Sequence, residues 1–195
     1  CPHGIFTIGT SAILKKHPEI QVEVEEQISG DIVRALLDGI ADIGVFAEGS
    51  PTTGLETQVI GNDELVIACS KLHPLSKKKN ITFEACLDYD FVGLNRGSSL
   101  LELTSRSAEK LGKQMRLRIQ VRSYDAMCQM IAVNLGIGVL PLQACIAQIQ
   151  AMNLEVVKLK DPWAQRELLL AIKAGANLSP AANLLREHLL KQCIT

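Results

Sequence analysis

The hydrophobic pattern of the first half of the chain alternates short apolar runs with one stretch of helical periodicity. Strands are predicted at residues 5–8, 20–25, 41–46, 55–60 and 65–69. Ser29 is a suitable N-cap for a helix that ends near Gly39. The apolar residues of this helix recur with helical spacing at Ile32, Val33, Leu36, Leu37 and Ile40. This order of elements predicts an α/β fold with a largely parallel sheet.

The second half of the chain repeats the alternation and predicts a second lobe. Strands are expected at residues 91–94, 117–121, 137–140, 154–159 and 167–172, helices at 100–111, 125–135 and 181–191, and a surface loop at 76–80. Gly112 and Gly136 stop the first two helices. Ser179 and Pro180 supply the N-cap and the first residue of the last helix.

The segment between the first two predicted strands is too short for a parallel crossover. Only eleven residues separate Ile8 from Ile20, and Pro18 removes part of them from any helix. A crossover with its helix needs about ten to twelve residues or more. We therefore predict that residues are missing between Ile13 and Lys16, and a continuous path from Thr10 to Pro18 would contradict this.

The composition is that of a folded globular protein and excludes several function classes. The 195 residues are 47% hydrophobic and 21% charged, and the formal net charge of −1 is unlike that of a strongly basic nucleic-acid-binding domain. Aromatic residues make up only 4%, so stacking platforms for bases are scarce and a small polar ligand fits better. No apolar run approaches the roughly 18 residues of a membrane span, and no secretory signal is recognisable. We therefore predict a cytoplasmic protein with no membrane partner.

The cysteines do not form a recognisable metal or disulfide motif. They are scattered, with no C-x-x-C pair and no histidine at metal-ligand spacing, at Cys1, Cys69, Cys86, Cys128, Cys145 and Cys193. Free thiols in a reducing compartment are the main expectation, and a redox switch or a metal site is the alternative. No cofactor and no metal ion are predicted.

Small hydroxyl and amide side chains recur where a predicted strand ends and a helix begins. The candidate ligand-binding residues are Thr10 and Ser11 at the first junction, Asn95, Arg96, Ser98 and Ser99 at the second, and Ser123 and Tyr124 at the third. Ligands of open α/β sheets bind at the carboxyl ends of strands, where helix N-termini offer N–H groups and partial positive charge. Three such junctions predict a pocket for a carboxylate or another anion.

Each of these residues also has a purely structural interpretation. The serines and the threonine are good helix caps. Arg96 suits a bidentate contact with a carboxylate, but it also suits a surface ion pair. Tyr124 fits the edge of a pocket and a core position equally well.

Other motifs are weaker. Residues 135–141 begin like a dinucleotide-binding fingerprint but lack its third glycine and follow a helix, so a tight turn with close packing explains them better. Arg116, Arg118 and Arg122 alternate along one strand face, which indicates a solvated or subunit-interface face, with a phosphate-binding stripe as the alternative. No nucleophile elbow surrounds Ser98 and Ser99, so nucleophilic catalysis is not expected.

An ordered series of short motifs resembles the effector-binding domain of bacterial LysR-type transcriptional regulators. The motifs are Thr10-Ser11-Ala12-Ile13, His17-Pro18-Glu19-Ile20, Ser29-Gly30, Leu37-Asp38-Gly39, Ala41-Asp42-Ile43-Gly44, Asp63-Glu64-Leu65-Val66, His73-Pro74-Leu75, Gly136-Ile137-Gly138-Val139-Leu140-Pro141 and Leu178-Ser179-Pro180-Ala181. They span nearly the whole chain, and their order and spacing carry the resemblance. The family has a full helix before its His-Pro motif, which strengthens the suspicion of missing residues here.

The resemblance implies the α/β fold of type 2 periplasmic binding proteins, with two Rossmann-like lobes joined by two crossing strands. Lobe I is then expected at residues 1–64 and 167–195, and lobe II at 65–166. The family binds a small-molecule effector in the cleft between its lobes, and its effector-contacting loops match the three junctions. Phe46 and Glu48 match a further loop more weakly.

The function implied by the resemblance is ligand sensing rather than catalysis. We expect a small anionic metabolite as effector, a homodimer or homotetramer, and promoter DNA bound only through an N-terminal winged helix-turn-helix domain absent from this chain. A free-standing solute-binding protein of a transporter is the alternative. An enzyme is disfavoured because no acid–base or nucleophile constellation is visible.

Overall fold

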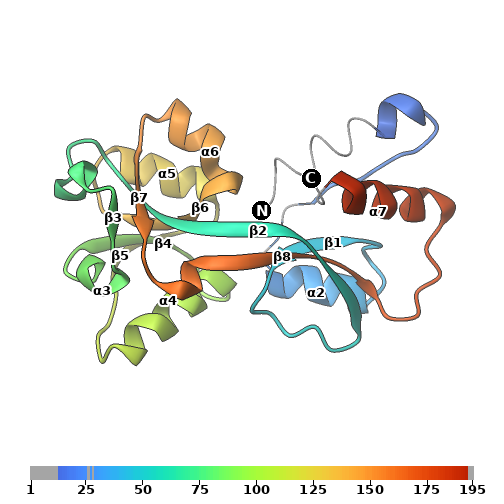
Figure 1. The fold of residues 1–195 in the computed structure, drawn as a ribbon, viewed down its shortest axis with the longest axis horizontal. Coiled ribbons are helices and arrows are strands. Elements are labelled where there is room, and N and C mark those ends of the chain that lie inside the picture. The colour runs from blue at the N-terminus through green and yellow to red at the C-terminus, as the bar shows by residue number, and fades with distance from the viewer. Residues whose placement is uncertain (1–12, 26, 28, 193–195) are drawn as a thin grey trace. The chain divides into compact units, whose positions relative to one another are not determined.

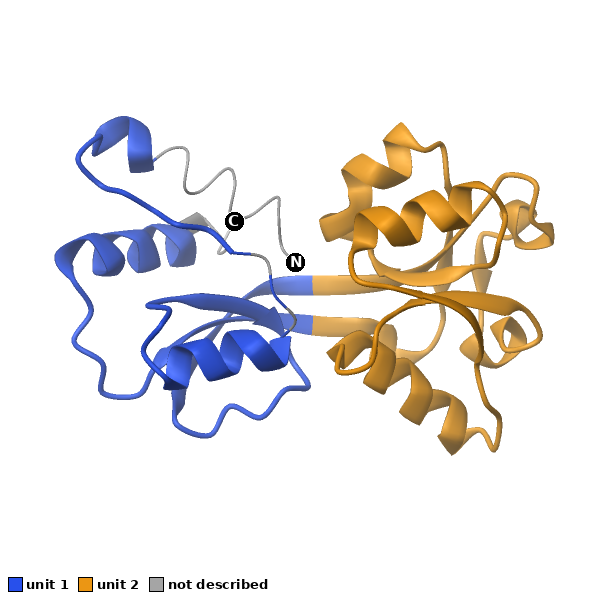
Figure 2. Cartoon of the chain, turned by 180° about the vertical axis from the view of Figure 1, so that it is seen from behind, with its two compact units in different colours: residues 1–62, 167–195 blue, residues 63–166 orange. Residues whose placement is uncertain are grey.

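The computed structural model describes residues 13–25, 27 and 29–192, and it falls into two compact units. Unit 1 comprises residues 1–62 and 167–195, and unit 2 comprises residues 63–166 (Figure 2). The chain crosses between them within two strands, β2 (Leu55–Cys69) and β8 (Gln165–Lys173) (Figure 1). The contacts therefore place the boundaries at 62/63 and 166/167.

Unit 1 is built on α2 (Ser29–Leu37), β1 (Gly44–Ala47) and α7 (Pro180–Gln192). Strand β1 pairs antiparallel with β8, with Gly44 opposite Ala171. Two apolar clusters form its core, one of Val33, Leu36, Phe46 and Ala171 and one of Ile13, Val45, Ile60, Leu168, Leu170, Leu185 and Leu189.

The end of α2 and the start of α7 follow from local sequence signals. The predicted helix after Ser29 is confirmed as α2, but it ends at Leu37, and Ile40 lies outside it and is 80% exposed. Gly39 adopts a φ of 71°, a conformation that favours glycine after a helix. Ser179 Oγ accepts a hydrogen bond of 3.1 Å from the Ala182 N–H, which confirms the predicted start of the last helix.

Unit 2 alternates strands and helices. Its elements are η1 (Pro74–Lys77), β3 (Asn80–Ile81), α3 (Phe83–Cys86), β4 (Asp90–Leu94), α4 (Ser99–Lys110), β5 (Arg116–Val121), α5 (Tyr124–Ala132), β6 (Gly138–Pro141), α6 (Leu142–Ala151), β7 (Glu155–Leu159) and η2 (Pro162–Ala164). Strand β2 pairs antiparallel with β6 and β7, whereas β7 pairs parallel with β3 and β4 pairs parallel with β5. The prediction of a largely parallel sheet is therefore wrong, because β2 runs against its partners in unit 2.

The core of unit 2 has two apolar clusters. Phe83 packs edge to face on Trp163 and Phe91, with ring centroids 5.0 and 6.1 Å apart, within a cluster that also contains Leu65 and Ile67. The second cluster joins β4 to α5 and α6 through Val92, Leu94, Met127, Cys128, Ile131, Leu140, Cys145 and Ile149. The helix α6 was not predicted from the sequence.

Two strand predictions are wrong. Residues 55–60 and 65–69 belong to one continuous strand, because Gly61 and Asn62 do not interrupt β2. Residues 20–25 form no assigned strand, although Ile20 and Val22 pack against the core of unit 1 while Gln21 and Glu23 are exposed. Val24, the third apolar residue of the predicted face, is 62% exposed. The alternation therefore identified the inward side chains of Ile20 and Val22 but neither the position of Val24 nor a hydrogen-bonded partner.

The chain is continuous where missing residues were predicted. Residues 13–16 form one helical turn, and the His17 N–H donates to the Ile13 carbonyl over 2.9 Å. This contradicts the prediction of a gap between Ile13 and Lys16. The crossover argument failed because it assumed a paired strand at residues 20–25. The Thr10 end of the path, and the strand predicted at residues 5–8, lie outside the described residues.

The described helices include none that is both long enough and apolar enough to cross a lipid bilayer.

Candidate functional site

The second strand-to-helix junction is a fixed turn between β4 and α4. The Asn95 N–H donates to the Val121 carbonyl over 2.9 Å, and the Ser98 N–H donates to the Asn95 carbonyl over 3.3 Å. Between them Gly97 adopts a φ of 91°, which favours glycine. The turn places Ser98 at the N-cap of α4, with the Glu102 N–H donating to its carbonyl over 3.0 Å.

The N-terminus of α4 is not capped by its own N-cap side chain. Ser98 is only 2% exposed, and its hydroxyl makes no capping hydrogen bond. A Ser at the N-cap ordinarily accepts from an N–H of the first turn. The partial positive charge of this twelve-residue helix therefore persists beside a buried hydroxyl.

The third junction lies next to the second. Strands β4 and β5 are parallel with Leu94 opposite Val121, so both strands end at the same edge of their sheet. Ser123 follows β5 and Tyr124 begins α5. The structure thus brings residues 95–99 together with residues 123–124, as the sequence predicted for successive junctions in an α/β fold.

The two residues of the third junction have clear structural roles. Ser123 Oγ accepts from the Ala126 N–H over 3.2 Å, so Ser123 is a helix cap. Tyr124 is half-buried and packs against both apolar clusters of unit 2. Capping and packing therefore account for these two residues without a ligand.

Charge favours an anion in this unit. Residues 63–166 contain fourteen Lys and Arg against ten Asp and Glu, a net charge of +4, whereas the rest of the chain has six against eleven, a net charge of −5. Arg96 and Asn95 are exposed on the turn. The planar guanidinium of an exposed arginine suits a bidentate contact with an anion.

The remaining candidates lie elsewhere. Thr10 and Ser11 are outside the described residues. Phe46 is 2% exposed and packs in the core of unit 1. Glu48 is exposed, and its N–H donates to the Glu167 carbonyl over 2.9 Å. Packing therefore accounts for Phe46 without a ligand.

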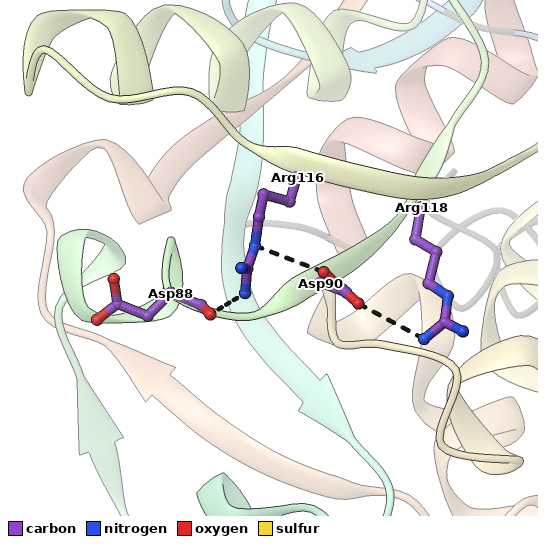
Figure 3. A network of polar contacts seen from close by, with 4 residues as sticks. All are labelled: Asp88, Asp90, Arg116 and Arg118. Carbon is purple, nitrogen blue, oxygen red and sulfur yellow. Dashed lines mark hydrogen bonds and ion pairs between the residues drawn. The ribbon is translucent and has the colours of Figure 1, made fainter.

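The arginines of β5 are held at the opposite end of β4. Asp90, the first residue of β4, pairs with Arg116 Nε and Arg118 Nη1, each over 3.5 Å, and Arg116 also donates to the Asp88 carbonyl (Figure 3). The side chains of Arg116 and Arg118 are 61% and 58% exposed. This confirms the solvated face predicted for these two residues. Their pairing with Asp90 argues against a phosphate-binding stripe.

A buried ion pair between the two crossing strands was missed by the sequence reasoning. Asp63 on β2 accepts a hydrogen bond from Arg166 on β8, and both side chains are more than nine-tenths buried. Asp63 is the first residue of unit 2 and Arg166 is the last. They are 103 residues apart in the sequence, so no local sequence pattern indicates the pair.

Three further observations limit the chemistry of the described part of the chain. It contains no group of three or more His, Cys, Asp or Glu side chains arranged to hold a metal ion. Cys69, Cys86, Cys128 and Cys145 are free, buried thiols, which confirms the main expectation for these four. A small void in unit 2 is apolar and does not suit an anion, since it is lined by Phe91, Val92, Gly93, Leu94, Leu100, Leu101, Thr104, Met115, Met127 and Val139.

Residues 10–194 match the family described as the LysR substrate binding domain. The chain belongs to this family. Its members are regulatory proteins, and the predicted resemblance is confirmed.

Curated relatives are transcriptional regulators of greater length. A probable RuBisCO transcriptional regulator of Trieres chinensis is 27% identical over 170 residues, which cover 80% of this chain and 55% of the relative. The nitrogen assimilation regulatory protein nac of Escherichia coli (strain K12) is 26% identical over 184 residues, which cover 92% of this chain and 58% of the relative. The LysR domain thus spans little more than half the length of these relatives.

Solved structures share the fold. The regulatory domain of CcmR from Synechocystis PCC6803, in complex with 2-PG, superposes with a TM-score of 0.89 at 22% identity and covers 98% of this chain and 93% of its own. The effector-binding domain of QuiR, in complex with shikimate, gives a TM-score of 0.84 at 20% identity and covers 96% of this chain and 90% of its own. The predicted α/β fold of type 2 periplasmic binding proteins is confirmed.

Proposed function

We propose that this chain is the effector-sensing domain of a cytoplasmic LysR-type transcriptional regulator and that it binds a small carboxylate or another small anion. DNA is contacted by another domain of the longer regulator. The observation that carries this proposal is the N-terminus of α4, where Ser98 is buried and makes no capping hydrogen bond. A helix N-terminus left in this state is suited to bind an anion.

In this proposal, different residues of unit 2 make different contacts with the anion. The Ser98 hydroxyl and the first-turn N–H groups of α4 donate hydrogen bonds to the anion, and Arg96 supplies a charge-assisted contact from the turn. Tyr124 limits the size of the ligand at the neighbouring junction. The net charge of +4 on residues 63–166 attracts anions to this unit.

Unit 1 contributes Thr10 and Ser11 in this proposal, on the strength of the family resemblance. The complexes of QuiR with shikimate and of CcmR with 2-PG support a small anion as the ligand class. LysR regulators act as oligomers on DNA, so we propose a homodimer or homotetramer as the working form. Ligand binding then alters transcription only through its different affinities for the two conformations of the regulator.

A thermal-shift screen tests the ligand class. We expect shikimate, 2-PG or inorganic sulfate to raise the melting temperature, because a ligand at 100 times its Kd adds about 2.7 kcal/mol to the free energy of unfolding. Replacing Arg96 by Ala weakens binding of the active probe tenfold or more, since a hydrogen bond to a charged group contributes about 1.5–3 kcal/mol. Shifts with neutral polyols alone would contradict an anion site.

Arg106→Ala is the matched control for Arg96→Ala. Arg106 lies on α4 itself, and its 72% exposed side chain reaches Glu102 over 3.8 Å. Removing it also removes one positive charge from unit 2. We expect ligand affinity to stay within about twofold, because an exposed pair is worth only about 0–1 kcal/mol. Equal losses in the two variants would show that only the net charge matters and would overturn the proposed contact.

Replacing Ser98 by Ala separates binding from stability. We expect the Kd for the anion to rise about tenfold, since the buried hydroxyl no longer donates. The free energy of unfolding should change little because the hydroxyl caps nothing. By contrast, Ser179→Ala removes a cap and lowers the free energy of unfolding by about 1 kcal/mol without affecting the Kd. Calorimetric titration and urea unfolding measure both, and unchanged affinity in Ser98→Ala would refute the assigned role.

A further inference from the structure

A buried hydroxyl in α4 is hydrogen-bonded to the backbone of the first turn of the same helix. Thr104 is 2% exposed, and its hydroxyl donates to the Leu100 carbonyl over 2.9 Å and to the Leu101 carbonyl over 3.0 Å. Both acceptors follow the buried N-cap residue Ser98 within three residues. The Thr104 hydroxyl therefore acts on the backbone at the end of α4 where the candidate site lies.

Packing alone does not require a hydroxyl at this position. Thr104 is one of the residues that line the apolar void of unit 2, beside Leu94 and Met127. A Val side chain has nearly the same shape and would bury no polar atom there. Threonine is also less favourable than Ala or Leu inside a helix, and its hydrogen bonds to carbonyls three and four residues back slightly destabilise the helix. The hydroxyl is thus a cost to the folded unit and calls for a role outside packing.

The two acceptor carbonyls belong to peptide groups that end at the helix N-terminus. The Leu100 carbonyl shares a peptide group with the Leu101 N–H, and the Leu101 carbonyl shares one with the Glu102 N–H. The Glu102 N–H donates to the Ser98 carbonyl over 3.0 Å. The Leu101 N–H precedes this first helical bond and has no acceptor within the helix. A hydrogen bond to a carbonyl polarises its peptide group and makes the N–H of that group a stronger donor.

We propose that Thr104 is a positioning residue for the anion, because its hydroxyl strengthens the hydrogen bond that the Leu101 N–H donates to the ligand. The inference rests on the proposed function, in which the first turn of α4 binds the anion. The Ser98 hydroxyl makes no capping hydrogen bond, so it leaves the Leu101 N–H to the ligand. The second bond of Thr104 strengthens the Glu102–Ser98 bond in the same way and holds the N-cap residue in place.

Two substitutions of Thr104 separate the hydroxyl from the methyl group. In Thr104→Val the hydroxyl is lost and the shape is kept, and we expect the Kd to rise about threefold, since coupled hydrogen bonds strengthen one another by about 10–30%. The melting temperature should stay the same or rise, because a buried polar group is removed. In Thr104→Ser the hydroxyl is kept, so the affinity should remain near that of the wild type, while loss of the methyl group lowers the melting temperature. Calorimetric titration with the probe active in the thermal-shift screen (shikimate, 2-PG or inorganic sulfate) measures the affinities.

Ser107→Ala is the matched control. Ser107 is 8% exposed, and its hydroxyl donates to the Leu103 carbonyl over 2.8 Å. The peptide group that it polarises carries the Thr104 N–H, which lies inside the helix and does not meet a ligand. We expect the Kd to stay within about 1.5-fold of the wild-type value, because the charge at a helix end acts within the first turn. Equal losses of affinity in Thr104→Val and Ser107→Ala, or in Thr104→Val and Thr104→Ser, would overturn the proposal, and so would wild-type affinity in Thr104→Val.

Amide resonances of the ligand-free protein test the polarisation without any ligand. In isotope-labelled protein we expect Thr104→Val to move the amide proton and nitrogen resonances of Leu101 and Glu102 upfield, because their peptide carbonyls lose a hydrogen bond. Thr104→Ser should leave these resonances near their wild-type positions, and Ser107→Ala should move those of Thr104 instead. Unchanged Leu101 and Glu102 resonances in Thr104→Val would show that the hydroxyl does not polarise these peptide groups, and the inference would fail.

The two measurements together distinguish failure of this inference from failure of the proposed function. If the resonances move and the affinity does not, the Leu101 N–H does not contact the anion and the role of Thr104 is refuted, although an anion still binds. If no anion binds the wild type, the proposed function fails and the role of Thr104 in binding fails with it. The resonances then still decide whether its hydroxyl polarises the first turn of α4.

Discussion

Replacing Asp63 by Ala lowers the free energy of unfolding by about 3–5 kcal/mol. The carboxylate of Asp63 is the partner of Arg166, and both side chains are more than nine-tenths buried. Removal of one member of a buried pair leaves the other charge in a medium of low dielectric constant without compensation. Among the described residues, the Nε atom of Arg166 is buried without a hydrogen-bond partner, so loss of Asp63 adds to a guanidinium that is already incompletely satisfied. Urea unfolding at neutral pH measures the loss.

The control for this variant lies one residue further along β2. Glu64 pairs with Lys158 over 3.4 Å, but their side chains are 27% and 67% exposed. Glu64→Ala should therefore cost at most about 1 kcal/mol. The double replacement Asp63→Leu with Arg166→Met should recover most of the stability lost in Asp63→Ala, because an apolar pair leaves no buried charge. Equal losses in Asp63→Ala and Glu64→Ala would show that burial of the pair has no energetic weight.

Local signals were sufficient to predict many helix ends and some strands. Ser179 and Pro180 begin α7 as expected, and Gly112 follows α4 with a φ of 67°. The prediction that α5 continues to residue 135, before Gly136, is wrong. That helix ends at Ala132, and Asn134 adopts the left-handed conformation with a φ of 60°. The start of α7 and the end of α4 depend on a few neighbouring residues, which explains why they could be identified without knowledge of the fold.

Features that depend on distant parts of the chain could not be predicted in the same way. The alternation at residues 20–25 indicates that Ile20 and Val22 face the core, but it misplaces the exposed Val24 and contains no information about a strand partner. The Asp63–Arg166 pair could be predicted only with the knowledge that β2 and β8 are neighbours in the sheet. The candidate site could be predicted from the sequence only in part. Its junctions were visible in the sequence, whereas their adjacency follows from the parallel pairing of β4 with β5.

Gly136 has a structural role that only the fold explains, and replacing it by Ala should lower the free energy of unfolding by about 3 kcal/mol. A Cβ at this position would lie 2.7 Å from the Asp90 carbonyl oxygen and 3.3 Å from the Phe91 carbonyl carbon, both backbone atoms. The Ile137 N–H donates to the same Asp90 carbonyl over 2.9 Å. A methyl group therefore both overpacks the contact and weakens a hydrogen bond, with costs of about 1–3 and about 1 kcal/mol. The sequence interpretation of a tight, closely packed glycine here, rather than a dinucleotide fingerprint, is confirmed.

Two other glycines show whether the loss in Gly136→Ala comes from its backbone neighbours. A Cβ at Gly138 would lie 2.6 Å from Met127 Cε and 2.7 Å from Ile131 Cδ1, both ends of side chains, whereas the nearest backbone atom, the Val92 carbonyl oxygen, is 3.2 Å away. Side-chain ends shift more easily than backbone atoms, so Gly138→Ala should cost less than Gly136→Ala. A Cβ at Gly30, in α2, meets nothing within 4 Å, and Gly30→Ala should raise the free energy of unfolding by about 0.4–1 kcal/mol. The order of stability Gly30→Ala, wild type, Gly138→Ala, Gly136→Ala follows from these contacts. A Gly136→Ala protein as stable as the wild type would show that residue 136 can move away from the start of β4 at little cost, and would contradict the close-packing interpretation.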